Sequence, residues 1–230
     1  MNAQTIGARL TEVLGRIRAA ERRNGRPDGS VALVAVSKRH RTEAIRAAYA
    51  AGQRAFGENY VQEAMAKQAE LADLAIEWHF IGRIQGNKTR QIAEHFSWVH
   101  SLCDPHHARR LDAQRPAGLP PLQACIQVNT TGEASKEGLA PEAVADLLTA
   151  CAHLERIQIC GLMTLPAPAQ DEPGQRRPLR ALRELRDRLA TPDRPLAVLS
   201  MGMSDDLEAA VAEGATVVRI GTAVFGPRPV

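Results

Sequence analysis

Lys38 has the residue type and the position of a chemically active amine. It directly follows the apolar, β-rich segment 31–37. Lysine is scarce in this chain. Of the 29 basic residues, only four are lysines, namely Lys38, Lys67, Lys88 and Lys136. A lysine amine can lose its proton and attack a carbonyl carbon, whereas an arginine guanidinium effectively cannot. Lys38 is therefore a candidate Schiff-base lysine, and a solvated strand end is the alternative interpretation.

Small and hydroxyl-bearing residues near the C-terminus form a candidate phosphate site. Glycine lets backbone N–H groups approach an anion closely, and serine and threonine add hydroxyl donors. Ser204 can equally be the N-cap of the helix that we expect to follow it. Asp205 and Asp206 would repel a phosphate unless their side chains point away from it. The residues of this candidate site are Ser200, Gly202, Ser204, Gly221 and Thr222.

Arg219 stands in the segment 217–220, which otherwise has the composition of a buried strand. A buried guanidinium must be paired or hydrogen-bonded, because an isolated charge in a protein core is very costly. Strand alternation puts Arg219 on the same face as Gly221. Arg219 therefore faces the same ligand as Gly221, or it forms an internal ion pair with Glu58 or another acidic residue at a strand end.

These groups together indicate a phosphorylated aldehyde as the ligand. Pyridoxal phosphate carries an aldehyde for Lys38, a phosphate for the glycine and hydroxyl residues, and a ring for Arg219. The alternative without this cofactor makes Lys38 the Schiff-base lysine of an aldolase or isomerase that acts on a sugar phosphate. The two hypotheses differ in whether the purified protein should show the visible absorption of a bound pyridoxal group.

Short β-rich segments alternate with helical segments after an N-terminal helix at about residues 3–23. Parallel strands need helical crossovers, so this alternation predicts a parallel sheet. The number of units predicts one α/β domain, residues 1–230, that folds as a single (β/α)8 TIM-type barrel with an extra N-terminal helix. A doubly wound open sheet is the alternative. The expected strands are 31–37, 54–58, 77–82, 97–102, 122–129, 157–163, 196–200 and 216–221.

The helical segments complete this predicted barrel. In such a barrel the site lies at the carboxyl ends of the strands, where Lys38 and the candidate phosphate residues stand. The segment Pro166–Pro178 contains four prolines, and we expect it to be an irregular, mobile loop. The expected helices are 42–51, 60–73, 87–95, 105–114, 141–152, 175–190 and 204–213.

The composition argues against several classes of protein. The net charge is only +3 and the basic residues are spread out, so no nucleic-acid partner is indicated. The four cysteines lack the spacing of a metal site. No signal peptide opens the chain, and no apolar run approaches the ~20 residues of a membrane span. We therefore expect a cytoplasmic monomer with no metal and no membrane partner.

Several segments in this order carry a resemblance to one family. The chain resembles the pyridoxal-phosphate homeostasis proteins, also called the YggS/PROSC family, across nearly its whole length. Motifs of this length in the same order are far more specific than any one of them alone. The matching segments are Leu33–Lys38, Phe56–Glu63, Trp78–Gly82, Gln85–Lys88, Ile126–Asn129, Gly161–Thr164, Leu199–Asp206 and Val218–Gly226.

The resemblance implies a barrel like the N-terminal domain of alanine racemase, with pyridoxal 5′-phosphate held as a covalent aldimine on Lys38. It also implies that Arg219 lies beside the pyridine nitrogen. His79 is equally well explained as a core histidine. The residues implied to surround the phosphate are Ser200, Ser204, Gly221 and Thr222. Those implied to line the rest of the pocket are Asn59, His79 and Met201.

The resemblance further implies a carrier of the cofactor rather than an efficient enzyme. Family members take part in vitamin B6 and amino-acid homeostasis, and pyridoxal-phosphate-dependent apo-enzymes are possible recipients. An arginine at the pyridine nitrogen weakens the ring as an electron sink. The sequence ends at Val230, which leaves no residues for the second domain of alanine racemase, and its only tyrosines are Tyr49 and Tyr60. We expect no robust catalysis, and a low-activity amino-acid racemase is the alternative.

Overall fold

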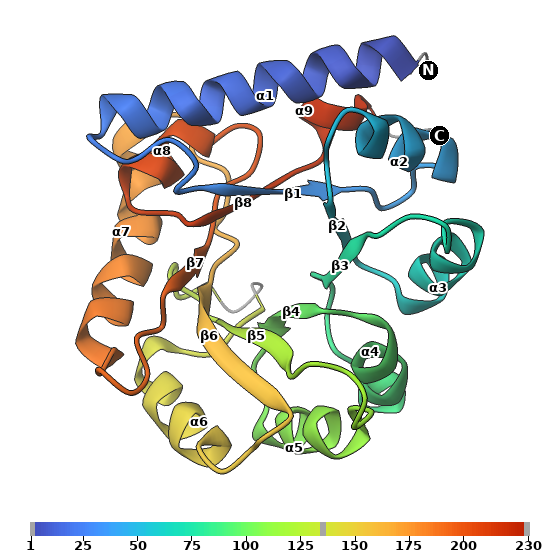
Figure 1. Cartoon of the computed structure of the whole chain (residues 1–230). Coiled ribbons are helices and arrows are strands. Elements are labelled where there is room, and N and C mark those ends of the chain that lie inside the picture. The colour runs from blue at the N-terminus through green and yellow to red at the C-terminus, as the bar shows by residue number, and fades with distance from the viewer. Residues whose placement is uncertain (1–2, 134–136, 228–230) are drawn as a thin grey trace.

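Eight parallel strands form a closed barrel in the computed structural model, which describes residues 3–133 and 137–227 (Figure 1). Each strand pairs with the next along the chain, and β8 pairs with β1. The predicted barrel is therefore confirmed, and the open sheet is wrong. The strands are β1 (Ala32–Val36), β2 (Ala55–Glu58), β3 (Glu77–Phe80), β4 (Trp98–Leu102), β5 (Leu122–Gln127), β6 (Ile157–Met163), β7 (Val198–Ser200) and β8 (Val217–Ile220).

A helical segment follows every strand, and these helices cover the outside of the barrel (Figure 1). Two of the crossovers begin with a 3-10 turn, η1 (Gly86–Lys88) before α4 and η2 (Pro141–Ala143) before α6. Lys136 lies outside the described residues. The helices are α1 (Ala3–Arg23), α2 (Thr42–Ala50), α3 (Val61–Glu70), α4 (Thr89–His95), α5 (Pro105–Gln114), α6 (Val144–Cys151), α7 (Glu172–Leu189), α8 (Leu207–Ala212) and α9 (Thr222–Phe225).

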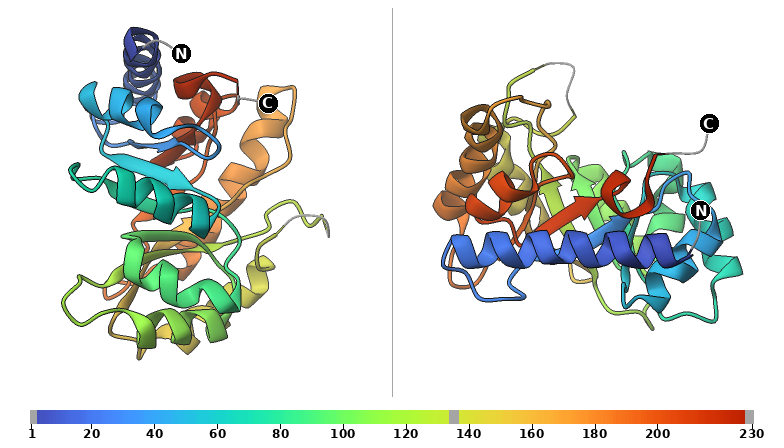
Figure 2. Two further views of the ribbon diagram at one scale, coloured as in Figure 1. Left: turned by 90° about the vertical axis from the view of Figure 1, so that its right-hand side faces the viewer. Right: turned by 90° about the horizontal axis from the view of Figure 1, so that it is seen from above.

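The extra N-terminal helix α1 lies across the β1–β8 side of the barrel (Figures 1 and 2). Its residues Ile6, Leu10, Val13 and Ile17 recur at helical spacing and are all buried. This apolar face packs against α2, α8 and α9. The predicted helix at 3–23 is therefore confirmed, and burial of this face explains why it folds onto the barrel.

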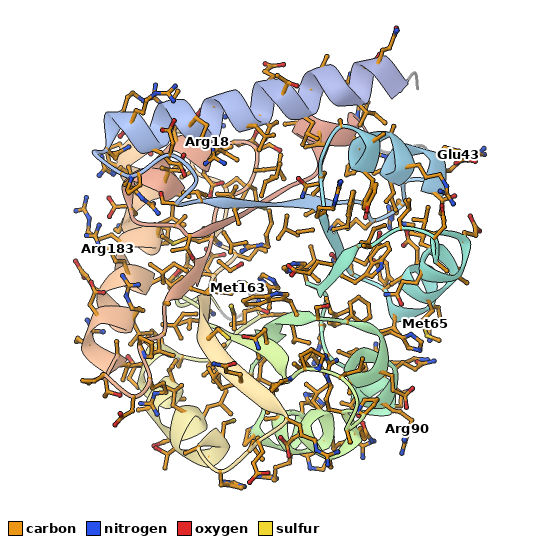
Figure 3. All side chains as sticks on the ribbon, in the orientation of Figure 1. Arg18, Glu43, Met65, Arg90, Met163 and Arg183 are labelled. Atoms are coloured by element: carbon orange, nitrogen blue, oxygen red, sulfur yellow. The ribbon has the colours of Figure 1, made fainter. Side chains whose placement is uncertain are left out.

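Two layers of side chains fill the fold. Strand residues alternate between the two faces of a sheet, so Leu33 and Ala35 of β1 join the main core beneath the helices, whereas Val34 and Val36 point into the barrel. Figure 3 shows side chains throughout both layers, with Met163 near the centre of the barrel. Among the described residues, no helix is both long and apolar enough to cross a membrane.

Several expected boundaries differ from the structure by a few residues, and two of these differences have a clear physical reason. The segment Pro166–Pro178 is only partly irregular, because α7 already begins at Glu172 and contains Pro173 in its first turn and Pro178 in its interior. Pro173 costs no helical hydrogen bond, because backbone N–H groups in the first turn have no partner within the helix. Pro178 removes one hydrogen bond in the helix interior, and burial of the leucine face of α7 compensates for this loss.

The helix expected from residue 204 begins only at Leu207. Residues 204–206 form a turn instead, in which Asp206 Oδ1 accepts a hydrogen bond of 2.6 Å from the backbone N–H of Met203. Ser204 is therefore not the N-cap of α8, and its side chain is left at the rim of the barrel. Side-chain-to-backbone bonds of this kind compete with helix formation.

Candidate functional site

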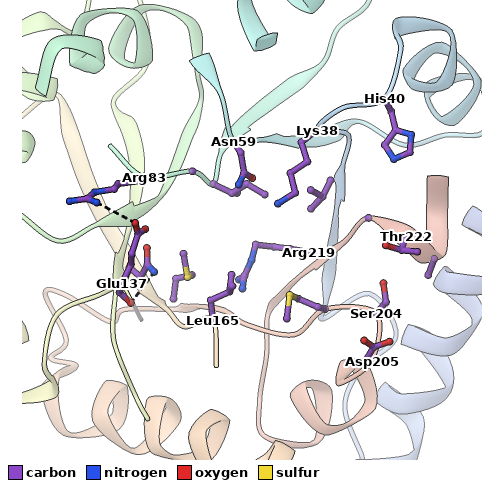
Figure 4. A pocket seen from close by; sticks show the side chains of 18 of the residues that line it. Lys38, His40, Asn59, Arg83, Glu137, Leu165, Ser204, Asp205, Arg219 and Thr222 are labelled. Carbon is purple, nitrogen blue, oxygen red and sulfur yellow. Dashed lines mark hydrogen bonds and ion pairs between the residues drawn. The ribbon is translucent and has the colours of Figure 1, made fainter. Parts of the chain in front are cut away.

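A cavity of about 600 Å³ opens at the carboxyl ends of the strands (Figure 4). Most of the predicted site residues line it, namely Lys38, Asn59, Ser204, Arg219, Gly221 and Thr222. The remaining predicted residues are His79, Ser200, Met201 and Gly202, which are buried and do not line this cavity. The volume is that of a typical site for a small ligand.

Lys38 and Arg219 point into this cavity from neighbouring strands (Figure 4). Lys38 follows the end of β1, and Arg219 lies in β8, opposite Val34 in the β1–β8 register. The side chain of Lys38 has the same parity as Val34 and Val36, which point into the barrel. The two cationic groups that the sequence singled out therefore share one cavity.

Lys67, in α3, holds the backbone next to Lys38 in place. Its Nζ donates to the carbonyl oxygen of Ser37 at 2.8 Å and to Glu58 Oε1 and Glu63 Oε1 at 2.7 Å each. The Ser37 hydroxyl also donates to Glu58 Oε1, at 2.6 Å. Burial raises the pKa of Glu58, and the charge of Lys67 opposes that rise. These contacts form a buried ionic network between β2 and α3.

The other side of Lys38 is held by the same network. Arg39 has a φ of 63°, a conformation that non-glycine residues adopt only in specific turns. Its backbone N–H donates to Glu63 Oε1, the oxygen that also binds Lys67. Ser37 and Arg39 flank Lys38 in sequence, so the ionic network fixes the backbone on both sides of the amine.

Arg219 is buried, with 3% of its surface exposed, and its hydrogen bonds are directed. Nη1 donates to Ser200 Oγ at 2.6 Å and Nη2 donates to the carbonyl oxygen of Thr164 at 2.9 Å. Burial lowers the pKa of Arg219 to about 10, so the guanidinium is still charged at neutral pH. The alternative of an ion pair with Glu58 is wrong, because Glu58 pairs with Lys67.

His79 lies in the barrel core behind Arg219 rather than on the cavity wall. Its Nδ1 is 2.9 Å from His100 Nε2 and its Nε2 is 2.7 Å from Glu77 Oε1. Its ring stacks on Trp98 with the ring centres 5.5 Å apart. Of the two interpretations of His79, the structure favours the core histidine.

Ser204, Gly221 and Thr222 line the end of the cavity that faces α1. A Cβ atom at Gly221 would lie 3.3 Å from the carbonyl oxygen of Val36, so glycine relieves a tight approach there. Asp205 also lines this end. Asp206 is turned away toward the backbone N–H of Met203, as described above. One of the two acidic residues is therefore removed from the cavity.

The family model of the alanine racemase N-terminal domain matches residues 14–229 of this chain. A curated relative, the pyridoxal phosphate homeostasis protein of Pseudomonas aeruginosa, is 55% identical over 224 residues, with 97% of this chain and 96% of the relative covered. The chain belongs to the pyridoxal phosphate homeostasis protein family. The member from Escherichia coli K12 is 45% identical over 226 residues, with 97% of both chains covered.

Solved structures agree with this membership of the pyridoxal phosphate homeostasis family. PipY of Synechococcus elongatus, solved with pyridoxal phosphate bound, superposes with a TM-score of 0.81 at 40% identity, covering 96% of this chain and all of PipY (100%). Alanine racemase from Corynebacterium glutamicum reaches a TM-score of 0.67 at 20% identity, covering 96% of this chain and 62% of the racemase. The likeness to the racemase shows the shared barrel alone.

Sequence reasoning missed several residues of this family member's cavity. Arg16 reaches it from α1 and donates to the carbonyl oxygen of Ser204 at 3.1 Å and to Glu208 Oε1 at 2.8 Å. His40 lines it next to Lys38, and its ring stacks on Phe225 at 5.0 Å. Nothing in the sequence could place Arg16 there, because α1 lies outside the repeating units of the barrel.

Asn59 carries a further signal of a ligand. It lines the cavity, and its Oδ1 is buried without a hydrogen-bond partner among the described residues. A Cβ atom at Gly82 would lie 2.0 Å from the backbone oxygen of Asn59, so only glycine fits beside it. A buried amide oxygen without a partner is costly, and a ligand with a hydroxyl donor would satisfy it.

Proposed function

We propose that this protein binds pyridoxal phosphate as a Schiff base on Lys38 and acts as a reversible carrier in intracellular vitamin B6 and amino-acid homeostasis. The observation that carries the proposal is the shared cavity of Lys38 and Arg219, with hydroxyl-bearing residues at one end. PipY, at 40% identity, was solved with pyridoxal phosphate bound. The remaining proposals on this site rest on these two findings.

The residues of the cavity fit the groups of this cofactor. The cofactor supplies an aldehyde, a phosphate and a pyridine ring. The amine of Lys38 adds to the aldehyde carbon, a C=N bond replaces the C=O bond, and one water molecule leaves. Asn59 has an unused buried acceptor for a ring hydroxyl. Because the step is reversed by water, the same chemistry loads and releases the cofactor.

Ser204, Gly221 and Thr222 are proposed to receive the phosphate, with hydroxyl groups and backbone N–H groups as donors. Arg16 adds a positive charge to the same end of the cavity, although Glu208 shares it. Ser200 and Met201, which the resemblance also assigned to the cofactor, are fully buried, and the Ser200 hydroxyl contacts Arg219. The phosphate would thus be bound where α1 meets the barrel.

Arg219 is proposed to face the pyridine nitrogen. A charged guanidinium disfavours protonation of that nitrogen and so weakens the ring as an electron sink. A weak sink suits a protein that holds the cofactor and slows chemistry at the α-carbon of an amino acid. We propose apo-enzymes as recipients, a cytoplasmic location and a monomeric state, each of which follows from the sequence-based expectations.

The test is the absorption spectrum of the purified protein after addition of pyridoxal phosphate, followed by borohydride reduction and peptide mapping. We expect a visible band, and reduction should attach the pyridoxyl group to Lys38. Lys38→Ala should abolish both, whereas Lys88→Ala, which changes another described lysine, should keep both. Persistence of the normal band and of the reducible attachment in Lys38→Ala would overturn the proposal.

Slow racemisation of amino acids is a second candidate, because the matching family model is that of the alanine racemase N-terminal domain. Incubation of the loaded protein with L-alanine and chiral analysis of the product distinguishes the two. Sustained turnover above that of free pyridoxal phosphate would favour the racemase. A protein that binds no pyridoxal phosphate at all would favour an aldolase or isomerase for a sugar phosphate.

A further inference from the structure

We propose that a one-directional chain of hydrogen bonds crosses the barrel core from Arg219 to Glu77, and that Ser200, His100, His79 and Glu77 are positioning residues for the guanidinium. The part of this inference that concerns the cofactor rests on the proposed function. The chain joins the cavity at the carboxyl ends of the strands to the opposite end of the barrel, where β3 begins with Glu77.

Four successive contacts make up this chain. Arg219 Nη1 lies 2.6 Å from Ser200 Oγ, and Ser200 Oγ lies 2.7 Å from His100 Nδ1. His100 Nε2 lies 2.9 Å from His79 Nδ1, and His79 Nε2 lies 2.7 Å from Glu77 Oε1. Each distance lies within the usual range for a hydrogen bond. The residues come from β8, β7, β4 and β3, so the chain ties together strands that lie far apart in the sequence.

The direction of every bond follows from the two ends. A guanidinium can only donate and a carboxylate can only accept, so with neutral rings the contacts allow one arrangement, in which His79 donates to Glu77 and Ser200 accepts from Arg219 and donates to His100 Nδ1. A neutral imidazole carries one proton, so that of His100 is on Nε2 and is donated to His79 Nδ1. His79 then carries its proton on Nε2 and donates it to the carboxylate of Glu77.

The surroundings favour neutral rings in the middle of the chain. His100 is fully buried and His79 is 3% exposed. Burial, followed by repulsion from His79 and Arg219, holds the pKa of His100 well below its ordinary value. The hydrogen bond from His79 lowers the pKa of Glu77, which keeps this group a carboxylate acceptor. A protonated His100 would have to donate from Nδ1 and would turn the Ser200 hydroxyl away.

These contacts fix the orientation of the Arg219 guanidinium in the site. Nη1 is held by Ser200 and Nη2 by Thr164, so two of the guanidinium nitrogens are committed on the core side. The remaining donors are left for the cavity that Arg219 lines. The direction of the Ser200 hydroxyl is set through His100 and His79 by Glu77, which lies at the far end of the barrel with half of its side chain exposed.

Histidine side-chain nitrogen NMR on the ligand-free, full-length protein tests the chain itself. We expect both His79 and His100 to be neutral with the proton on Nε2, assigned with His79→Gln and His100→Gln variants. Glu77→Gln keeps an oxygen acceptor and should preserve both tautomers, whereas Glu77→Leu should make the tautomer of His79 mixed. A proton on Nδ1 of either ring, or an imidazolium at neutral pH, would overturn the proposal.

Cofactor binding tests the effect on Arg219. Glu77→Leu should weaken the affinity for pyridoxal phosphate about three- to tenfold, the factor that corresponds to the loss of one ordinary hydrogen bond, and should shift the absorption maximum of the bound cofactor. Glu77→Gln should keep the affinity and the absorption maximum of the wild type. Glu155, an exposed residue in the turn before β6 at the same end of the barrel, supplies the control Glu155→Leu, which should change neither.

The two experiments separate this inference from the proposed function. A wild-type protein that binds no pyridoxal phosphate would contradict the proposed function and leave the NMR result intact. If the wild-type protein binds the cofactor, a normal affinity and an unshifted absorption maximum in Glu77→Leu would overturn the positioning role alone.

Discussion

Two buried polar networks support the cavity, and they lie on opposite faces of the same sheet. The ionic network of Lys67, Glu58 and Glu63 lies outside the barrel, between β2 and α3. The hydrogen-bond chain from Arg219 to Glu77 lies inside it. The first holds backbone groups on both sides of Lys38, and the second holds the side chain of Arg219.

The networks also differ in whether all of their buried polar atoms have hydrogen-bond partners. Glu58 Oε2 is buried and has no hydrogen-bond partner among the described residues. In the interior chain, by contrast, both histidine rings use both of their nitrogens. The comparison suggests that the ionic network depends on each of its charges, whereas the chain depends on the direction of its bonds.

The largest predicted effect follows from removing the cation of the ionic network. Lys67→Met leaves Glu58 buried with no opposite charge, and breaking a buried pair in this way costs about 3–5 kcal/mol. We expect this loss in the free energy of unfolding, measured by urea denaturation. Because Lys67 also holds the carbonyl oxygen of Ser37, the attachment of cofactor to Lys38 should slow as well.

A second substitution and a control sharpen this result. Lys67→Met combined with Glu58→Leu removes both charges and should recover part of the lost stability, because apolar replacement of a buried pair is often nearly neutral. Lys88→Met, at a half-buried lysine of η1, should stay within about 0.5 kcal/mol of the wild type. A Lys67→Met protein as stable as this control would show that the ionic network contributes little.

The next effect concerns the middle of the interior chain. Ser200→Ala removes the acceptor of Arg219 and the donor of His100 together, and each buried group left without a partner costs about 1–3 kcal/mol. Ser101 is a buried serine of β4 whose hydroxyl donates only to the carbonyl oxygen of Gly82. Ser101→Ala should therefore be less destabilising than Ser200→Ala in the same urea titration, and an equal loss would contradict the chain.

The two networks should respond to acid in opposite directions. Burial lowers the pKa values of His79 and His100 from 6.5, so the unfolded chain binds more protons below about that pH and these residues lower the stability as the pH falls. Burial raises the pKa of Glu58 from 4.5, so Glu58 binds its proton more readily when folded and opposes the loss.

Urea titrations between about pH 5 and pH 7.5 test this contrast. His100→Gln should flatten the fall in stability toward low pH, whereas Glu58→Gln should steepen it. Identical pH profiles for the wild type and His100→Gln would show that the interior histidine does not titrate differently in the two states.

Much of the fold was predictable from local patterns, and the networks were not. Alternation of β-rich and helical segments predicted the barrel, and Lys38 and Arg219 were predictable because a scarce lysine and a buried charge are unusual in a sequence. The pairing of Lys67 with Glu58 depends on the packing of α3 against β2. The contact of His100 with Ser200, 100 residues apart, depends on closure of the barrel, which no local pattern contains.

The smallest predicted effect on stability is that of Glu77→Leu. The carboxylate is half-exposed, so its contact with His79 should contribute less than about 1 kcal/mol to the free energy of unfolding. The same substitution should nevertheless change the tautomer of His79 and the affinity for pyridoxal phosphate. Unchanged stability together with changed affinity would show that the interior chain orients Arg219, whereas a loss as large as that of Lys67→Met would make it a stability element like the ionic network.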